Sequence, residues 1–420
     1  MSFEVDGIAP RTVLRPRTIE ELATELARLD SERQAVIPWS GGTRMHMGNV
    51  PAAYDAVIKL SSLPVSVEHV AGDMVCIVSA NATVSAVQRE LRKSGQRLPF
   101  DVPNPAVATI GGSLASGAAG RMRSSFGGAR DWVIGLKVML PNGTVTKSGG
   151  RVVKNVQGFD LHRLHTGALG TLGIIIEAGF KLVPTAPSET TVAAWFEDLR
   201  LSRQYAMSIF NGPFTPEALT LATGPHASEL VETLAGEVGQ AKAPYLVLLK
   251  AAGINAAVER MTSEATGLAG TCGATGYRVL EAAPAAGAWE TISPGAAPGS
   301  LTVRASATPG AAFGLISQVE QFARRREGLR HSVLFDVGFG SVQFNFDSSD
   351  EVTLTSCVDA VGEAVRSEAG TYVVEQAPPA IKSSIDVFGT HGANMELMKR
   401  LKQEFDPNST LNRGRFAGGI

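Results

Sequence analysis

Cysteine is scarce in this sequence. Its 420 residues include three cysteines, Cys76, Cys272 and Cys357, which lie far apart and never form a CxxC pair. Iron–sulfur clusters are held by sets of cysteine thiolates, and disulfide-stabilised domains need many paired cysteines, so the sequence predicts neither. The pattern favours a protein that works in a reducing compartment, which we expect to be the cytoplasm.

Basic blocks and long apolar runs are also lacking. The formal net charge is −2, and the one basic triplet, Arg324–Arg326, lies in a helix-like stretch that we interpret as an exposed helix face. Nucleic acid is therefore not an expected partner. No apolar stretch approaches the roughly 20 residues of a membrane span. Met1–Pro10 carries acidic residues and no apolar core, so we do not expect a signal peptide there.

The length predicts more than one hydrophobic core. Pro184 and Pro187 mark a boundary, so we expect a first domain over 1–185. Residues 186–380 alternate strand-like and helix-like segments, which predicts an α+β domain on an antiparallel sheet. In that stretch the run of Ala, Gly and Pro over 282–298 predicts a surface loop. Residues 381–420 contain an amphipathic helix, Glu396–Phe405, which Asp406-Pro407 ends.

Glycine is abundant in three places in the first domain. These segments are Trp39–Thr43, Thr109–Gly120 and Gly167–Gly173. A backbone without Cβ atoms can approach a ligand closely, and successive N–H groups can bind an anion. One such segment is more often an ordinary turn, but three together indicate a site for the pyrophosphate of a dinucleotide.

The common nucleotide motifs do not account for these glycines. The sequence has no GxxxxGK followed by Ser or Thr, which a P-loop requires. The spacing of Gly167, Gly170 and Gly173 differs from the GxGxxG of a Rossmann fold, and a β-branched run follows it. From these residues alone we predict a dinucleotide site of undetermined class.

The order of the motifs resembles the FAD-binding domain shared by vanillyl-alcohol oxidase, p-cresol methylhydroxylase and D-lactate dehydrogenases. The resemblance is carried by Pro38–Thr43, Ala108–Gly112, Gly127–Pro141, Gly170–Ile174, Phe405–Pro407 and Leu411–Arg415. Lys154–Leu161 is similar to a segment of the FAD-binding subunits of glycolate oxidases, with Phe159 where Tyr is usual. The match is good over 15–185 and 396–420, and loose between them.

This resemblance implies an α+β fold, with a two-lobed FAD-binding domain and a cap domain on an antiparallel sheet. It implies that residues 39–43 and 108–113 hold the pyrophosphate through backbone N–H groups, and that residues 170–175 line the adenine and ribityl side. The full set of cofactor-binding residues that it implies is Trp39, Ser40, Gly41, Gly42, Thr43, Ala108, Thr109, Ile110, Gly111, Gly112, Ser113, Gly117, Arg130, Asp131, Gly170, Thr171, Gly173, Ile174, Ile175 and Asn412.

Two positions depart from the family pattern. Thr43 stands where relatives with covalent flavin often have His, and His46 comes three residues later, so the resemblance implies non-covalent FAD. Arg413 stands where Pro is common in the last segment.

The catalytic residues stay unassigned. Oxidation of a 2-hydroxy acid needs a base near the hydroxyl and a cation for the carboxylate. Arg304 and Lys382 could meet a carboxylate, but structural roles are the more common ones for such residues. Asp336, beside two glycines, is typical of a turn. His162 and His165 have i,i+3 spacing, and we interpret them as structural, so no metal site is expected.

Two hypotheses remain. In the first, the chain oxidises a small 2-hydroxy acid, such as glycolate or D-lactate, within a complex similar to glycolate oxidase. In the second, it is a non-catalytic flavin-bearing subunit that relays electrons or scaffolds the complex. Either implies a second flavoprotein subunit and an iron–sulfur subunit as partners. We expect a cytoplasmic protein, with membrane association only through those partners.

Overall fold

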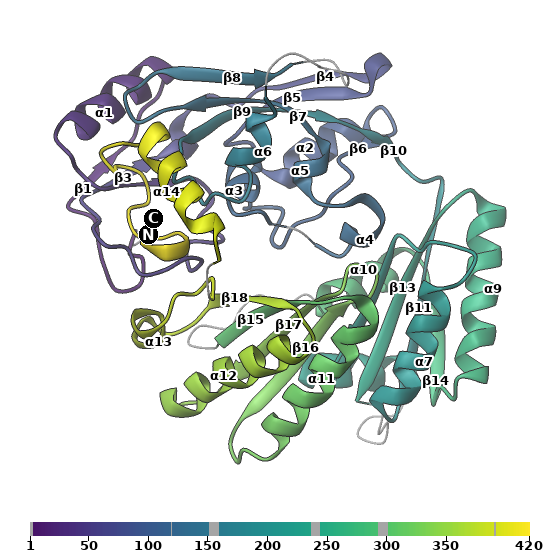
Figure 1. Cartoon of the computed structure of the whole chain (residues 1–420). Coiled ribbons are helices and arrows are strands. Elements are labelled where there is room, and N and C mark those ends of the chain that lie inside the picture. The colour runs from purple at the N-terminus through teal and green to yellow at the C-terminus, as the bar shows by residue number, and fades with distance from the viewer. Residues whose placement is uncertain (1–2, 119, 151–158, 237–243, 293–300, 390–391) are drawn as a thin grey trace. The chain divides into compact units, whose positions relative to one another are not determined.

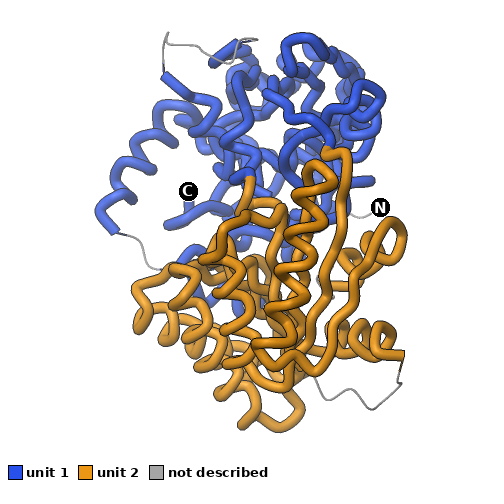
Figure 2. The backbone as a smooth tube through the Cα atoms, turned by 90° about the vertical axis from the view of Figure 1, so that its right-hand side faces the viewer, with its two compact units in different colours: residues 1–120, 126–185, 379–420 blue, residues 121–125, 186–378 orange. Residues whose placement is uncertain are grey.

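The computed structural model describes residues 3–118, 120–150, 159–236, 244–292, 301–389 and 392–420. The chain forms two compact units. Unit 1 contains residues 1–120, 126–185 and 379–420, and unit 2 contains residues 121–125 and 186–378 (Figure 2). Most of the Lys154–Leu161 motif lies outside the described residues.

The first lobe of unit 1 is a small parallel sheet with one long helix. Its strands pair in the order β1-β3-β2, with all pairs parallel. Leu22, Leu26 and Leu29 recur at helical spacing and are fully buried against this sheet. The Thr18 hydroxyl caps the helix by accepting a hydrogen bond from the Glu21 amide. The elements of this lobe are β1 Thr12–Leu14, α1 Ile19–Ser31, β2 Val36–Trp39, β3 Ala56–Lys59 and the short helix η1 Leu60–Ser62.

The second lobe of unit 1 is an antiparallel sheet in the order β4-β5-β9-β7-β8 (Figure 1). Its core contains Phe100, Phe180 and Leu114, which places α3 against the sheet. Its elements are β4 Val67–Val70, η2 Ala71–Asp73, β5 Val75–Ser79, α2 Val84–Arg92, β6 Gln96–Arg97, α3 Ile110–Ala115, α5 Ala129–Trp132, β7 Val133–Met139, β8 Val145–Gly149, α6 Leu161–His165, β9 Ile174–Lys181 and β10 Val183–Pro184. The helix α4, Arg123–Phe126, follows α3 in the chain.

The C-terminal segment completes unit 1. It contains α13 Pro379–Ser384, α14 Asn394–Phe405 and η3 Ala417–Gly419. Leu411 is buried in the core of the first lobe, and the Val36 amide donates to the Thr410 carbonyl. The last residues of the chain are thus built into the lobe formed by the first sixty.

Unit 2 is built on one antiparallel sheet of eight strands, in the order β14-β11-β13-β12-β16-β17-β15-β18. Helices cover both of its faces: Trp195 packs with α8 and α10, whereas its neighbour Phe196 points the other way and meets Tyr205 of α7. The strands are β11 Ser188–Phe196, β12 Ala218–Ala222, β13 Tyr245–Gly253, β14 Gly276–Leu280, β15 Leu301–Ser306, β16 Arg330–Asp336, β17 Ser341–Asp347 and β18 Thr371–Gln376. The helices are α7 Leu199–Phe210, α8 Pro225–Ala235, α9 Asn255–Thr271, α10 Ala282–Thr291, α11 Pro309–Arg324 and α12 Glu351–Ser367.

The expected surface loop over 282–298 is wrong in its first part. Residues Ala282–Thr291 form α10, and Ala288 is buried in the core of unit 2. Alanine has the highest helix propensity, and a proline within the first turn removes no helical hydrogen bond. The alanine content therefore decided this segment, and Pro284 did not interrupt it. Within the described residues, no helix has the length and apolar character that a membrane crossing requires.

Candidate functional site

The three glycine-rich segments meet at one cleft in unit 1. The cleft contains about 930 Å³ of empty space, part of it open to solvent. The first lobe contributes Pro38, Ser40, Gly41, Gly42, Thr43, Arg44, Met45, Leu60 and Leu63. The second lobe contributes Ala80, Asn81, Thr109, Gly111, Gly112, Ala115, Ser116, Leu169, Gly170, Gly173, Ile174, Ile175 and Ile176, and the C-terminal segment contributes Asn412 and Arg415.

The lining of this cleft combines apolar and cationic residues. Leu60, Leu63 and the run Ile174–Ile176 provide the apolar wall. Among the described residues that line it, Arg44 and Arg415 carry charge, and none is Asp or Glu. Such a surface suits a long ligand that combines flat apolar groups with negative charge.

The first loop carries hydrogen-bond donors that the protein does not use. Among the described residues, the amides of Gly41, Gly42 and Thr43 donate to no protein acceptor. The buried Ser40 hydroxyl also lacks a partner. Gly42 has a φ of +71°, and a Cβ there would lie 2.7 Å from the Trp39 indole nitrogen. The loop therefore needs glycine for its own path, and its unpaired amides are suited to phosphate oxygens.

The second segment differs from the expectation. Residues Ile110–Ala115 form α3 rather than an open loop, with Thr109 as its N-cap. The Ile110 amide donates to the Ala82 carbonyl, and the Gly111 amide donates to the Ala80 carbonyl at 2.7 Å. The Gly112 amide makes only a long bond, 3.3 Å, to the Thr109 hydroxyl. Most amides of this segment are thus occupied within the protein, and Gly112 has the weakest of these bonds.

The third segment is held by a residue from the end of the chain. Gly170 has a φ of +67°, and a Cβ there would lie 3.2 Å from the Asn412 side-chain nitrogen. That nitrogen donates to the Leu169 carbonyl at 2.8 Å, while the Asn412 side-chain oxygen accepts from Arg415. Asn412, an expected cofactor residue, therefore connects two loops that line the cleft.

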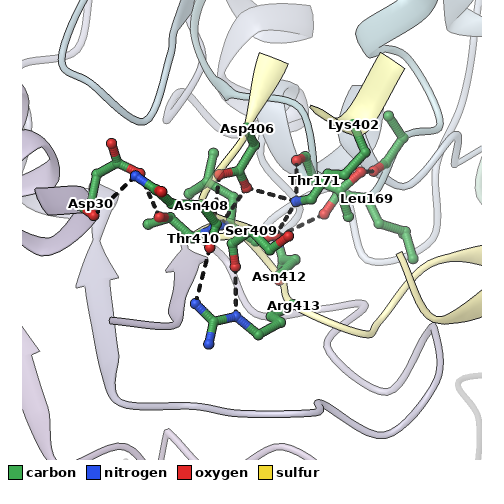
Figure 3. A network of polar contacts seen from close by, with 12 residues as sticks. Asp30, Leu169, Thr171, Lys402, Asp406, Asn408, Ser409, Thr410, Asn412 and Arg413 are labelled. Atoms are coloured by element: carbon green, nitrogen blue, oxygen red, sulfur yellow. Dashed lines mark hydrogen bonds and ion pairs between the residues drawn. The ribbon is translucent and has the colours of Figure 1, made fainter. Parts of the chain in front are cut away.

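A buried lysine fastens the same two loops (Figure 3). The Lys402 ammonium donates to the Thr171 carbonyl at 2.8 Å, the Leu411 carbonyl at 3.0 Å and the Asp406 carboxylate at 2.6 Å. Asp406 in turn accepts from the amides of Thr410 and Leu411. Burial lowers the pKa of Lys402, and the charge of Asp406 opposes that shift. The sequence pattern predicted the helix that carries Lys402 but not this role.

Arg415 connects the C-terminal segment to the residues that directly follow the first loop. Its guanidinium donates to the carbonyls of Met45 and Met47 at 2.7 and 2.6 Å. The residue is 4% exposed, and its Nε–H has no partner among the described residues. Burial lowers its pKa to about 10, so the group remains a cation at neutral pH. Arg415 lay in a motif that carried the family resemblance, but it was not among the expected cofactor residues.

Several expected cofactor residues do not line the cleft. Trp39, Ala108, Ile110, Ser113 and Thr171 are buried behind it, and Trp39 packs edge-on against Phe3. Gly117 lies just beyond α3, with a φ of +62°. Arg130 and Asp131 are exposed on α5, where the Asp131 carboxylate accepts from the Gly128 amide. These residues shape or support the domain in this structure. Ser40, Gly41, Gly42, Thr43, Thr109, Gly111, Gly112, Gly170, Gly173, Ile174, Ile175 and Asn412 do line it.

The candidate catalytic cations are paired with carboxylates. Arg304 makes a two-pronged contact with Glu375, at 2.8 and 3.0 Å. Lys382 is buried and donates to Asp6 and to the His46 carbonyl.

Burial lowers the pKa of His165 to about 4, and its ring meets Phe405 edge-on. In the part of the chain that the structure describes, no group of three or more His, Cys, Asp or Glu residues could hold a metal ion.

Comparisons with known proteins also indicate an FAD-binding domain in the first part of the chain. Residues 10–149 match the model of a family described as FAD binding domain. The chain is 30% identical over 216 residues to the glycolate oxidase subunit GlcD of Bacillus subtilis, which covers 51% of this chain and 46% of that protein. It is 32% identical over 186 residues to D-2-hydroxyglutarate dehydrogenase of Xanthomonas citri pv. viticola, covering 44% of this chain and 39% of that protein. Each alignment thus spans less than half of the relative.

The whole chain also has a known fold. It superposes on 4-ethylphenol oxidase from Gulosibacter chungangensis with a TM-score of 0.70 at 16% identity, covering 96% of this chain and 88% of that one. The chain therefore shares the fold of 4-ethylphenol oxidase. The chain carries an FAD-binding domain, and its matched region is homologous to the glycolate oxidase subunit.

The residues of the cleft fit FAD. The unpaired amides of Gly41, Gly42 and Thr43 and the unpartnered Arg415 Nε–H can be satisfied by phosphate oxygens. The apolar wall of Leu60, Leu63 and Ile174–Ile176 suits aromatic rings. The phosphates and the aromatic rings of the dinucleotide therefore each have a counterpart in the lining.

Proposed function

We propose that this chain takes part in FAD-dependent oxidation of a small 2-hydroxy acid such as glycolate or D-lactate. The observation that carries the proposal is the cleft lined by all three glycine-rich segments, in a chain whose relatives are a glycolate oxidase subunit and a 2-hydroxy-acid dehydrogenase. In this proposal residues 1–185 and 381–420 form the FAD-binding domain, and residues 186–380 form the substrate domain.

The first loop and the C-terminal segment would hold the cofactor. The amides of Gly41, Gly42 and Thr43 would donate to its phosphates, while Ile174 and Ile175 would pack against its rings. Bound FAD would supply the two-electron acceptor for the carbon that bears the hydroxyl group. The chain's own contribution is to orient that acceptor and to exclude water from it.

We also propose that FAD is held without a covalent link. Thr43 lines the cleft at the position where a histidine link would be expected, and a threonine hydroxyl is a poor candidate for such a link. Denaturing the purified protein should release the flavin into the supernatant. Yellow colour that stays with the precipitated chain would contradict non-covalent binding.

One observation favours the second role, that of an accessory subunit. Arg304 is bound by Glu375 through two hydrogen bonds, so this cation is not available to a substrate carboxylate. A chain of this kind would depend on a second flavoprotein subunit for the reaction and on an iron–sulfur subunit to pass electrons onward. In this version the protein is cytoplasmic and reaches a membrane only through those partners.

The test is an absorbance spectrum of the purified full-length chain, recorded before and after anaerobic addition of glycolate or D-lactate. L-Lactate serves as the stereochemical control. Flavin bands that bleach with glycolate or D-lactate support direct oxidation by this chain. Flavin bands that persist would overturn direct oxidation and favour the accessory role. A chain that binds no added FAD would contradict both.

A further inference from the structure

Arg415 is a buried cation with no direct carboxylate partner among the described residues. The carbonyls of Met45 and Met47 and the side-chain oxygen of Asn412 accept from its two terminal nitrogens, and all three acceptors are uncharged. Its Nε–H is buried and unpartnered, and the side chain forms part of the cleft lining. Among the described residues, no carboxylate is in ion-pair contact with it.

The nearest charges leave a positive surplus. Asp6 acts on Arg415 electrostatically, but this carboxylate forms its direct ion pair with Lys382. Lys382 is itself buried, so two cations share one acid in this part of unit 1. Taking a charge out of water without a partner of opposite sign is strongly unfavourable, and buried charges in proteins are as a rule paired with an opposite charge.

The ligand of the cleft offers the missing anion. In oxidised FAD the isoalloxazine and adenine rings are neutral, and the negative charge lies on the two phosphates. We propose that Arg415 is the counter-charge for the pyrophosphate and makes the cleft select phosphorylated flavins over riboflavin. This inference rests on FAD binding and does not depend on which substrate the protein oxidises.

Arg413 provides a matched control two residues away. It too is an arginine that donates to backbone carbonyls, those of Ser409, Arg33 and Asn408. Unlike Arg415, it does not line the cleft. The two side chains therefore share the task of fastening loops, and only Arg415 faces the ligand site.

The experiment measures the dissociation constants of FAD, ADP and riboflavin for the flavin-stripped full chain. The variants are Arg415→Met, Arg415→Gln, Arg415→Lys and Arg413→Met. ADP carries the pyrophosphate without the flavin, and riboflavin carries the flavin without phosphate. Removing one partner of a buried, hydrogen-bonded charge pair costs roughly 30-fold or more in affinity. We expect Arg415→Met and Arg415→Gln to raise the dissociation constants of FAD and ADP by about that factor. The dissociation constant of riboflavin should stay within about threefold of the wild-type value.

The remaining variants decide whether Arg415 acts through its charge on the ligand or only holds the surrounding loops in place by hydrogen bonds. Arg415→Lys keeps the positive charge but lacks the planar guanidinium with its several donors. Its dissociation constant for FAD should stay within about tenfold of the wild-type value. Arg413→Met should leave all three constants unchanged. If riboflavin weakens as much as FAD, or if Arg415→Lys is as poor as Arg415→Met, Arg415 only fastens loops and the proposal is wrong. Arg415→Gln retains a donor for one carbonyl, so it carries the test if Arg415→Met does not fold.

Discussion

Two arginines, one in each unit, use opposite means to keep a charge inside a folded domain. Arg304 in unit 2 is paired with Glu375 on the neighbouring strand β18, and its side chain is 27% exposed. Arg415 in unit 1 is 4% exposed and donates to neutral oxygens from separate segments. The first charge is cancelled within one sheet. The second remains uncancelled at a cleft, and so it is the one that a ligand's anion can use.

Lys402, also in unit 1, resembles Arg415 more closely than Arg304, because most of its hydrogen bonds go to backbone carbonyls. It has a carboxylate partner in Asp406, but its other two donors go to the carbonyls of Thr171 and Leu411. Asp406 likewise accepts from two backbone amides. In unit 1, buried charge therefore organises loops, whereas in unit 2 a side-chain pair lies across an already regular sheet.

The largest effect that would sharpen this comparison is expected at Lys402. The Lys402→Met variant leaves Asp406 buried and unpaired, which should lower the free energy of unfolding by about 3–5 kcal/mol. The double variant Lys402→Met/Asp406→Leu should remain destabilised by about 1–3 kcal/mol for each orphaned backbone group. Urea denaturation measures both, and FAD affinity should fall with them because Thr171 and Leu411 lose their common anchor.

Lys399→Met is the matched control for this prediction, since Lys399 lies on the same helix and is exposed. It should change stability by no more than about 0.5 kcal/mol. A double variant at Lys402 and Asp406 that is as stable as the wild type would mean that the loops do not depend on the pair. The contrast between the two units would then disappear.

A second test uses His165 in unit 1, since no charged group offsets the effect of burial on its pKa. Burial alone lowers the pKa of His165 from 6.5 to about 4. Between these values the unfolded chain binds a proton that the folded chain does not. Stability should therefore fall by up to about 3 kcal/mol as the pH drops from 6.5 to 4, and this contribution should level off below 4.

His165→Gln separates this contribution from the carboxylates that titrate in the same range. Chemical denaturation at a series of pH values should give the variant a shallower slope between pH 6.5 and 4 than the wild type. Equal slopes would show that His165 is protonated in the folded protein, and that unit 1 accommodates a further buried cation beside Lys382, Lys402 and Arg415.

The smallest effect is expected for the pair in unit 2. Replacing both partners in Arg304→Met/Glu375→Leu should change stability by less than about 1.5 kcal/mol, because two charges are exchanged for apolar contact. FAD affinity should stay at the wild-type value. A large loss in the double variant would mean that Arg304 also organises its surroundings, as the cations of unit 1 do. Glu375→Gln, which leaves Arg304 without its carboxylate, should be the more harmful change.

The type of fold could be predicted from the sequence because its signals are local. Leu22, Leu26 and Leu29 at helical spacing gave α1, and Thr18 marked its start. Motif order gave the FAD-binding fold of the first domain. The part of the predicted loop over 282–291 was misread because Ala, Gly and Pro favour loops in a composition count, and residues 293–298 lie outside the described residues. Burial of Ala288 in the core cluster that also contains Trp195, which no local count contains, stabilises α10 there.

The glycine loops were visible in the sequence, whereas the state of their amides was not. Glycine at residue 42 permits a backbone with positive φ, and the structure has that conformation. The Gly111 amide looks equally available in the sequence, yet it donates to the Ala80 carbonyl, about thirty positions earlier. A pattern of residue types records where donors exist, and only the fold records which of them the protein has already used.

The sequence by itself indicated a dinucleotide site, since a pyrophosphate needs close backbone approach and glycine permits it at several points, and the order of its motifs indicated FAD through the family resemblance. It also determined that the chain returns to this site at its end, through Leu411–Arg415. Only the tertiary structure decided which cations are available there. Arg304, Arg413 and Arg415 are chemically identical in the sequence, and their partners differ because the fold places a carboxylate beside the first, only carbonyls around the second, and an open cleft beside the third.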